Sequence, residues 1–288
     1  MGNVNVNSRL IGEGHGCYVI AEIGINHNGD LSIAKKLVKE AKDAGCDAVK
    51  FQKRTVEVVY TKAELEKSRE NPFGATNGDL KRGLEFSKED YAELDKYCKE
   101  LNITWFASPW DEGSVDFLEE FKVPCHKIAS ASLTDDGLLK HIKTKNKPII
   151  MSVGMSSEEE IEHAVKILGQ DNLVLLHTVS TYPAKNENVN LKAIKTLAEK
   201  YPNIPIGYSG HEAGEAISLA AVAMGACVIE RHFTLNKTMW GSDQKASIEP
   251  NEMKRLVEDI RCIESAMGTG KIECIAEEIP VKEKLRRK

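Results

Sequence analysis

Short apolar runs alternate with amphipathic segments along almost the whole chain. The apolar runs predict eight strands, at 18–24, 47–52, 103–108, 125–130, 148–153, 173–178, 206–209 and 227–233. The segments between them repeat apolar residues at helical spacing and predict helices at about 31–44, 87–101, 112–121, 135–145, 158–168, 190–200, 214–224 and 252–267. Asp30, Ser87 and Ser157 are placed as N-caps of three of these helices.

Eight strands that alternate with helices favour a (β/α)8 barrel, which we expect over residues 18–270. The competing architecture is an open doubly wound sheet, which concentrates its chemistry at one switch point, whereas here polar groups end every strand. No Gly-x-Gly-x-x-Gly follows a strand, so a dinucleotide site is unsupported.

The segments outside this repeat are harder to interpret. Residues 1–17 are expected to form an N-terminal extension with a small hairpin, in which 9–16 marks the turn. Residues 54–86 are the least regular part and are expected to form a long loop. Residues 271–288 are expected to be a frayed basic tail.

Composition narrows the class of protein. The 288 residues fit one large barrel or two smaller domains, and the net charge of −5 gives no basic footprint for nucleic acid. No apolar run approaches the ~18 residues that span a bilayer, and the N-terminus has no signal-peptide pattern. The seven cysteines are scattered and contain no C-x-x-C. We therefore expect a protein of the reducing cytoplasm, with no disulfide framework and no membrane contact.

Two consecutive strands end in a histidine, at His211 and His232. In a barrel, the carboxyl ends of all strands surround one mouth, so both imidazoles can point into it. Each alone is most simply an ordinary strand-end residue. Together, among polar neighbours, they favour a divalent-metal pair.

Lys50 and Lys127 each lie inside an otherwise apolar strand, where an unpaired ammonium group is costly. Several hydroxyls arrive at the same mouth from other strands: Ser108, Ser130, Ser152 and Ser209. Ammonium and hydroxyl groups together suit a phosphate. Glu22 is either a buried partner for Lys50 or a proton-transfer group beside the anion. His27 and His177 are interpreted as wall groups, and Glu230 as a further polar group at the mouth.

Seven motifs resemble the sialic acid synthase family, over about residues 9–270: AEIGINHNGD (21–30), AVKFQ (48–52), KIAS (127–130), SVGM (152–155), TYP (181–183), GYSGH (207–211) and ERHFT (230–234). The resemblance implies a transferase that condenses phosphoenolpyruvate with the aldehyde of an N-acylated sugar of the N-acetylmannosamine type. The products are a 3-deoxy-2-keto sugar acid and phosphate.

The resemblance also assigns roles at matching positions. His211 and His232 would hold Mn²⁺ or Mg²⁺, which polarises the aldehyde. Glu22, Lys50 and Lys127 are the expected catalytic residues. The phosphoenolpyruvate ligands are expected to be Lys50, Ser108, Lys127, Ser130, Ser152 and Ser209, and the sugar ligands Gln52, Tyr182 and Asp243.

Two departures from the family pattern fall on the sugar half. Ser132 stands where the family has a sugar-binding Glu, and the C-terminal antifreeze-like domain of many members is expected to be absent. The exact acceptor is therefore left open. We expect a homodimer, and either a separate capping protein or residues 60–86, with Arg82 as a cationic contact, to cover the mouth.

Two other functions remain as alternatives. One is a metal-dependent aldolase or hydrolase on the same barrel, and a hydrolase would favour a richer ligand set than two histidines. The other is a non-catalytic sugar-phosphate binding protein, against which the combination of Glu22 with both histidines argues.

Overall fold

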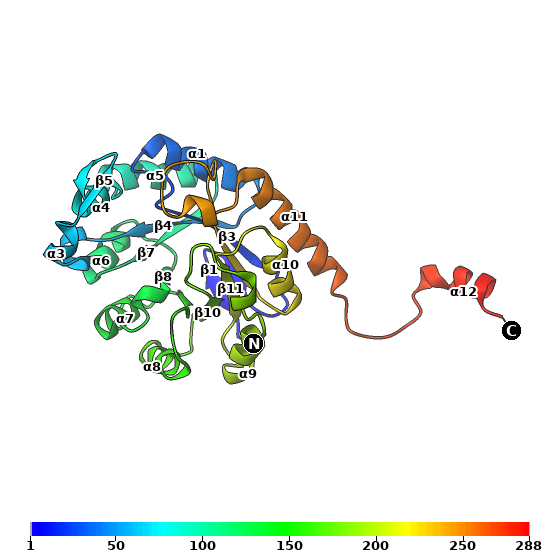
Figure 1. The fold of residues 1–288 in the computed structure, drawn as a ribbon. Coiled ribbons are helices and arrows are strands. Elements are labelled where there is room, and N and C mark those ends of the chain that lie inside the picture. The colour runs from blue at the N-terminus through cyan, green and yellow to red at the C-terminus, as the bar shows by residue number, and fades with distance from the viewer. Residues whose placement is uncertain (1, 288) are drawn as a thin grey trace.

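The computed structural model describes residues 2–287, and its centre is a ring of eight parallel strands surrounded by helices (Figure 1). The strands are β3 (Tyr18–Gly24), β4 (Ala48–Lys53), β7 (Thr104–Pro109), β8 (His126–Ile128), β9 (Ile149–Ser152), β10 (Leu173–Thr178), β11 (Ile206–Gly210) and β12 (Val228–His232). Their hydrogen-bonded order is β7-β4-β3-β12-β11-β10-β9-β8. The two end strands, β7 and β8, pack against each other, so the barrel is nearly closed. The predicted (β/α)8 architecture is confirmed.

The outer ring consists of the predicted helices: α1 (Leu31–Asp43), α5 (Lys88–Glu100), α6 (Glu112–Glu120), α7 (Asp136–Lys143), α8 (Glu158–Leu168), α9 (Lys192–Lys200), α10 (Ala216–Ala223) and α11 (Pro250–Ala266). The expected N-caps Asp30, Ser87 and Ser157 all accept hydrogen bonds from first-turn amides. In α1 the buried residues Ala34, Leu37, Val38 and Ala41 recur at helical spacing, which explains why the pattern was readable from sequence.

An antiparallel hairpin, β1 (Val4–Val6) and β2 (Arg9–Ile11), precedes the barrel. The expected turn at 9–16 is wrong, because Arg9–Ile11 is the second strand and the turn is formed by Asn7 and Ser8 at φ of 50° and 67°. An asparagine tolerates this left-handed conformation better than most residues do.

The hairpin lies across the amino-terminal ends of the barrel strands. Asn7 Nδ2 donates to Thr104 Oγ1 at 2.9 Å, at the beginning of β7, and the Arg9 guanidinium lies 3.4 Å from Asp47, just before β4. Val4, Val6 and Ile11 are buried in the main core. The hairpin therefore closes the end of the barrel opposite to the candidate site.

The expectation of an irregular loop at 54–86 is wrong as well. This segment folds into short elements, namely α2 (Val56–Val59), α3 (Lys62–Leu65), the antiparallel pair β5 (Ser68–Asn71) and β6 (Gly74–Thr76), and α4 (Asn77–Gly83). Capping boxes formed by Thr61 with Glu64 and by Thr76 with Asp79 begin two of the helices. Elements this short show no apolar period, which is why the pattern missed them.

Beyond α11 the chain leaves the barrel (Figure 1). The expected frayed tail contains a short helix instead, α12 (Ile279–Leu285), which lies away from the other elements. Within residues 2–287, no helix combines the length and apolarity needed to cross a bilayer.

Candidate active site

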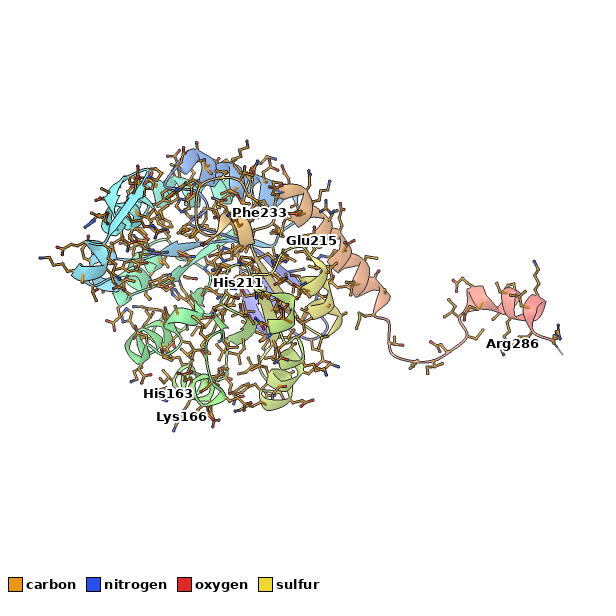
Figure 2. The ribbon with its side chains drawn as sticks, in the orientation of Figure 1. His163, Lys166, His211, Glu215, Phe233 and Arg286 are labelled. Carbon is orange, nitrogen blue, oxygen red and sulfur yellow. The ribbon has the colours of Figure 1, made fainter. Side chains whose placement is uncertain are left out.

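A cavity of about 220 Å³ lies at the carboxyl ends of the barrel strands. All of the sequence-predicted site residues line it except Asp243: Glu22, Lys50, Gln52, Ser108, Lys127, Ser130, Ser152, Tyr182, Ser209, His211 and His232. Figure 2 labels His211 in the interior of the molecule, close to the end of its strand. The prediction that these groups meet at one mouth agrees with this arrangement, whereas their individual roles remain predictions.

Strand register explains why residues so distant in sequence converge. Glu22 pairs with His232 on one side and with Lys50 on the other. Gln52 pairs with Ser108 one strand further along. In a parallel sheet, paired residues lie at the same height, and the side-chain period of two aims them at the same face.

The floor of the cavity is a cluster of two ammonium groups and two carboxylates. Lys50 Nζ lies 2.8 Å from Glu22 Oε2, 3.1 Å from Ser108 Oγ and 3.7 Å from Glu230 Oε1. Lys127 Nζ donates to Ser152 Oγ at 2.6 Å and lies 3.8 Å from the same Glu230 oxygen. All four charged groups are at most 5% exposed. Glu230 thus bridges the two lysines at ion-pair distance.

Burial and neighbouring charges shift the pKa values of this cluster. Burial raises the pKa of Glu22 to about 7, although Lys50 opposes the shift. Burial lowers the pKa of Lys127 to about 8, although Glu230 opposes it. For Lys50, burial favours a lower pKa, but Glu22 and Glu230 outweigh it and raise the pKa. The pKa values of Glu22 and Lys127 are therefore both shifted toward neutral pH. Such shifts are typical of sites that transfer protons or bind anions.

His211 and His232 lie side by side, with ring centroids 5.3 Å apart, and Tyr182 packs on His211 at 4.2 Å. The His211 Nδ1–H donates to the Val179 carbonyl at 2.7 Å, which leaves Nε2 as a free lone pair. The buried Nδ1 of His232 has no hydrogen-bond partner among the described residues. Burial lowers the pKa of both imidazoles, that of His211 to about 4, and keeps them neutral.

These observations fit a metal ion held by two imidazoles. The two rings are close enough to share one ion, and each offers a nitrogen that is not bonded within the protein. No group of three or more His, Cys, Asp or Glu in residues 2–287 is arranged to hold a metal. Asp243 Oδ2 lies 3.8 Å from His232 Nδ1, so Asp243 is next to this pair although it does not line the cavity.

The serines divide into two kinds. Ser108 and Ser152 accept hydrogen bonds from Lys50 and Lys127. Ser130 Oγ instead accepts from the Gly154 amide at 3.0 Å, and Ser209 donates to Glu230 at 3.1 Å. A Cβ at position 154 would lie only 2.9 Å from Ser130 Oγ, so the close approach of this loop depends on glycine.

Sequence reasoning did not assign a role to Glu230 and missed the support behind the histidines. Fully buried Arg231 donates to Glu212 Oε1 at 3.0 Å and to the Glu212 carbonyl at 2.6 Å. Tyr208 OH donates to the other Glu212 carboxylate oxygen at 2.6 Å, and Ser218 accepts from Arg231 at 3.0 Å. A signal was present, because Arg231 stands between Glu230 and His232 in one strand and must point to the opposite face, where a guanidinium needs a partner.

The remaining expectations have mixed outcomes. His27 stacks on Phe86 with ring centroids 4.0 Å apart, and His177 bonds to the Val189 carbonyl at 2.7 Å. Neither lines the cavity at the mouth, so they are not part of its wall. Ser132 is buried in a 3₁₀ turn, and it does not line the cavity. The suggested contact from Arg82 is wrong, because this side chain pairs with Glu57 at 3.0 Å and lines a different hollow.

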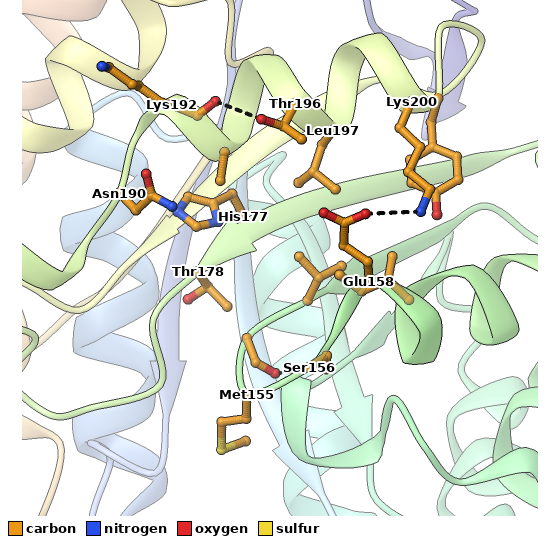
Figure 3. Close-up of a pocket in the computed structure, with 15 residues that line it drawn as sticks. Met155, Ser156, Glu158, His177, Thr178, Asn190, Lys192, Thr196, Leu197 and Lys200 are labelled. Carbon is orange, nitrogen blue, oxygen red and sulfur yellow. Dashed lines mark hydrogen bonds and ion pairs between the residues drawn. The ribbon is translucent and has the colours of Figure 1, made fainter.

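A second cavity, of about 410 Å³, lies outside the barrel wall between α8 and α9 (Figure 3). Lys200, at its edge, pairs with Glu158 at 3.4 Å, and His177 faces it from β10. Met155 lines both this cavity and the one at the barrel mouth. None of the predicted site residues lines this larger cavity.

Comparison with known proteins gives consistent results. The NeuB family profile matches residues 37–272. N-acetylneuraminate-9-phosphate synthase of Homo sapiens is 42% identical over 281 residues, which are 96% of this chain and 78% of the human protein. N,N'-diacetyllegionaminic acid synthase of Campylobacter jejuni is 44% identical over 260 residues, which are 88% of this chain and 78% of that one.

Among solved structures, the N-acetylneuraminic acid synthetase of Leptospira borgpetersenii in complex with citrate has a TM-score of 0.87 at 35% identity, and the match covers 99% of this chain and 98% of that one. The profile covers most of the barrel, and the two curated relatives exceed 40% identity over nearly the same region. As its motifs predict, the chain belongs to the NeuB family.

Proposed function

We propose that this protein condenses phosphoenolpyruvate with the aldehyde of an aldose and releases inorganic phosphate and a 3-deoxy-2-keto sugar acid. The observation that carries the proposal is the buried cluster of Lys50, Lys127, Glu22 and Glu230 beside the histidine pair. The two relatives described above are synthases of nonulosonic acids, which supports the same reaction class.

The two ammonium groups suit the phosphate and carboxylate of phosphoenolpyruvate. Glu230 stands 3.7 and 3.8 Å from them, close enough to stabilise both charges and too far to occupy their hydrogen-bond donors fully. Ser108 and Ser152 lie on the same two lysines and add short donors. An incoming anion therefore gains charge-assisted hydrogen bonds in a site that excludes most water.

In the proposed reaction, carbon 3 of phosphoenolpyruvate forms a bond to the aldehyde carbon, whose oxygen becomes a hydroxyl. Water adds at carbon 2, and the bond between carbon 2 and the phosphate oxygen breaks, which leaves a ketone and inorganic phosphate. Glu22 lies at the end of β3, and its pKa of about 7 lets it give or accept the proton at carbon 2 near neutral pH.

His211 and His232 are the residues that would hold a divalent metal. When bound, the ion would polarise the aldehyde oxygen. Two imidazole ligands favour Mn²⁺ over Mg²⁺, because Mg²⁺ prefers oxygen ligands throughout. Tyr182 covers the His211 ring, so it can bind the acceptor next to this pair, together with Gln52 and Asp243.

The wider setting follows the same proposal. We take residues 18–270 as the catalytic unit, which works in the cytoplasm as a homodimer, and we propose that a separate capping protein covers the open mouth. The relatives do not decide the acceptor, because the human protein is named for a phosphorylated product and the Campylobacter protein is not, at nearly equal identity.

Phosphate release tests the proposal. The assay combines phosphoenolpyruvate with a panel of aldoses, including N-acetylmannosamine and its 6-phosphate, before and after treatment with a chelator and re-addition of Mn²⁺. We expect release that needs both substrates and the metal, and a His211→Ala protein that no longer binds Mn²⁺ by calorimetry. Release from phosphoenolpyruvate alone, or none with any aldose, would contradict the proposal.

A further inference from the structure

A third cavity, of about 390 Å³, lies at the same end of the barrel as the candidate active site. Its wall comes from three segments: the turn after β3 with Asn28, the β5 and α4 residues Arg69 and Lys81, and the loop after β12 with Trp240 and Ser242. The strands that lead into these segments are neighbours, in the order β4-β3-β12. The cavity therefore lies on the rim of the mouth, over the sector that carries Glu22 and His232.

The basic residues of 53–85 fall into two groups. Most have a carboxylate partner: Lys53 and Arg54 pair with Glu85, Lys62 with Glu66, and Arg82 with Glu57. Lys67, Arg69 and Lys81 pair with no carboxylate in the described part of the chain, and of these three only Arg69 and Lys81 line the rim cavity. Arg69 contacts Asn77 Oδ1 at 3.4 Å, and Lys81 lies over the Tyr60 ring at 4.9 Å. Both of these uncompensated cations line the rim cavity.

The rim cavity is linked to the histidine pair by two side chains. Ser242, in its wall, donates to Asp243 Oδ1 at 2.6 Å, and Asp243 Oδ2 lies 3.8 Å from His232 Nδ1. The rim cavity therefore lies beside the part of the mouth that carries His232, although the two cavities share no lining residue.

An aromatic wall flanks the same space. Trp240 is 43% exposed, and Phe73 meets it edge-on with ring centroids 6.4 Å apart. Phe73 is fixed from behind, because its ring packs directly against the backbone of Gly83 and Gly29. A large, partly exposed indole beside cations and amides suits a ligand with an apolar face and a charged end.

We propose that the rim cavity binds a phosphate on the carbon of the acceptor farthest from the aldehyde, so that the acceptor is a phosphorylated aldose and the product a phosphorylated sugar acid. This inference rests on the proposed condensation and specifies its second substrate. Arg69 and Lys81 supply the charge, and the Asn28 amide lies in the same wall as a neutral donor. Glu70 also lines the cavity and opposes an anion, so two cations act against one carboxylate.

The test compares kcat/KM for an N-acylated aldose and for its 6-phosphate, at saturating phosphoenolpyruvate, in the wild type and in Arg69→Gln, Lys81→Met and the double variant. Each loss of a charged contact to phosphate should lower kcat/KM for the phosphorylated acceptor about tenfold, through KM. The unphosphorylated acceptor should be unaffected. Glu70→Gln should raise kcat/KM for the phosphorylated acceptor and leave kcat/KM for the unphosphorylated acceptor unchanged.

Lys67→Met is the matched control, because Lys67 belongs to the same segment, has no ion pair in the described residues, and does not line the cavity. An unphosphorylated aldose that is used as well as its 6-phosphate, with variants that do not discriminate, would overturn the inference and leave the condensation standing. Failure of every aldose to release phosphate would remove the condensation, and the inference with it.

Discussion

The two cavities on either side of the β9–α8 loop contain many of the same residue types but use them differently. The cavity between α8 and α9 is the larger, at about 410 Å³, and its Lys200 lies on the surface with Glu158 and Glu162 as partners. The cavity at the barrel mouth is about 220 Å³, and its lysines are nearly completely buried.

This difference shows that volume is a poor guide to function here. A surface lysine with carboxylate partners costs little and contributes little, because water screens both charges. Two ammonium groups buried within reach of the same carboxylate are costly to maintain and are retained where they bind something. The placement of charge, rather than the size of the hollow, distinguishes the candidate site.

Removing a buried ammonium should have the largest effect. Lys127→Met should lower kcat/KM for phosphoenolpyruvate by at least about 100-fold, because charged hydrogen bonds in a water-poor site are lost. Steady-state assays of phosphate release measure this loss in kcat/KM. Ser152→Ala, which removes only the neutral partner of Lys127, should cost much less; equal losses would show that the charge is not what matters.

Breaking the support behind the histidines should come next. Glu212→Gln leaves Arg231 buried without its counter-charge, so the free energy of unfolding should fall by about 3 kcal/mol in urea titrations. The affinity for Mn²⁺ should fall too, since Glu212 follows His211 directly. Ser218→Ala is the milder comparison. A variant that is destabilised but binds Mn²⁺ normally would confine this network to folding.

The pH profile should separate two groups at the mouth. If Glu22 acts in its protonated form, kcat should fall about tenfold as pH rises from about 6 to 8, because its carboxyl loses the proton near 7. Above about 8, KM for phosphoenolpyruvate should rise as Lys127 loses its charge. Glu22→Gln should abolish the first change and keep the second; a profile unaltered by that substitution would remove Glu22 from proton transfer.

The smallest effect is expected in the cavity between α8 and α9. Lys192→Met and Thr196→Val should leave both kinetic constants within about twofold of the wild type, as is usual for surface changes outside a site. Met155 lines both cavities, so a substitution of Met155 is the comparison that should alter the kinetic constants more. A large loss from Lys192→Met would mean that the two cavities are coupled.

Much of the fold could be predicted because its information is local. Barrel strands such as β3 and β10 are largely apolar runs, and caps such as Ser157 mark where helices begin. The mouth could be predicted because parallel strands align their ends. Residues 54–86 could not, since their short helices depend on local caps such as Thr61 with Glu64.

The pairing of individual side chains could not be predicted from the sequence either. That Glu230 stands between both lysines, or that Arg231 meets Glu212, depends on side-chain directions across neighbouring strands. Sequence indicates that such groups need partners and leaves the partner open. The pairing of Arg82 with Glu57 shows the same limit, because charge alone suggested a contact at the mouth.

The β1–β2 hairpin has a consequence for how molecules enter and leave the barrel. Because Val4, Val6 and Ile11 plug the far end of the ring, molecules reach the lysines only from the side where the histidines stand. Both substrates and both products must then pass through this one opening, so a molecule bound at the mouth obstructs exchange at the lysines below it.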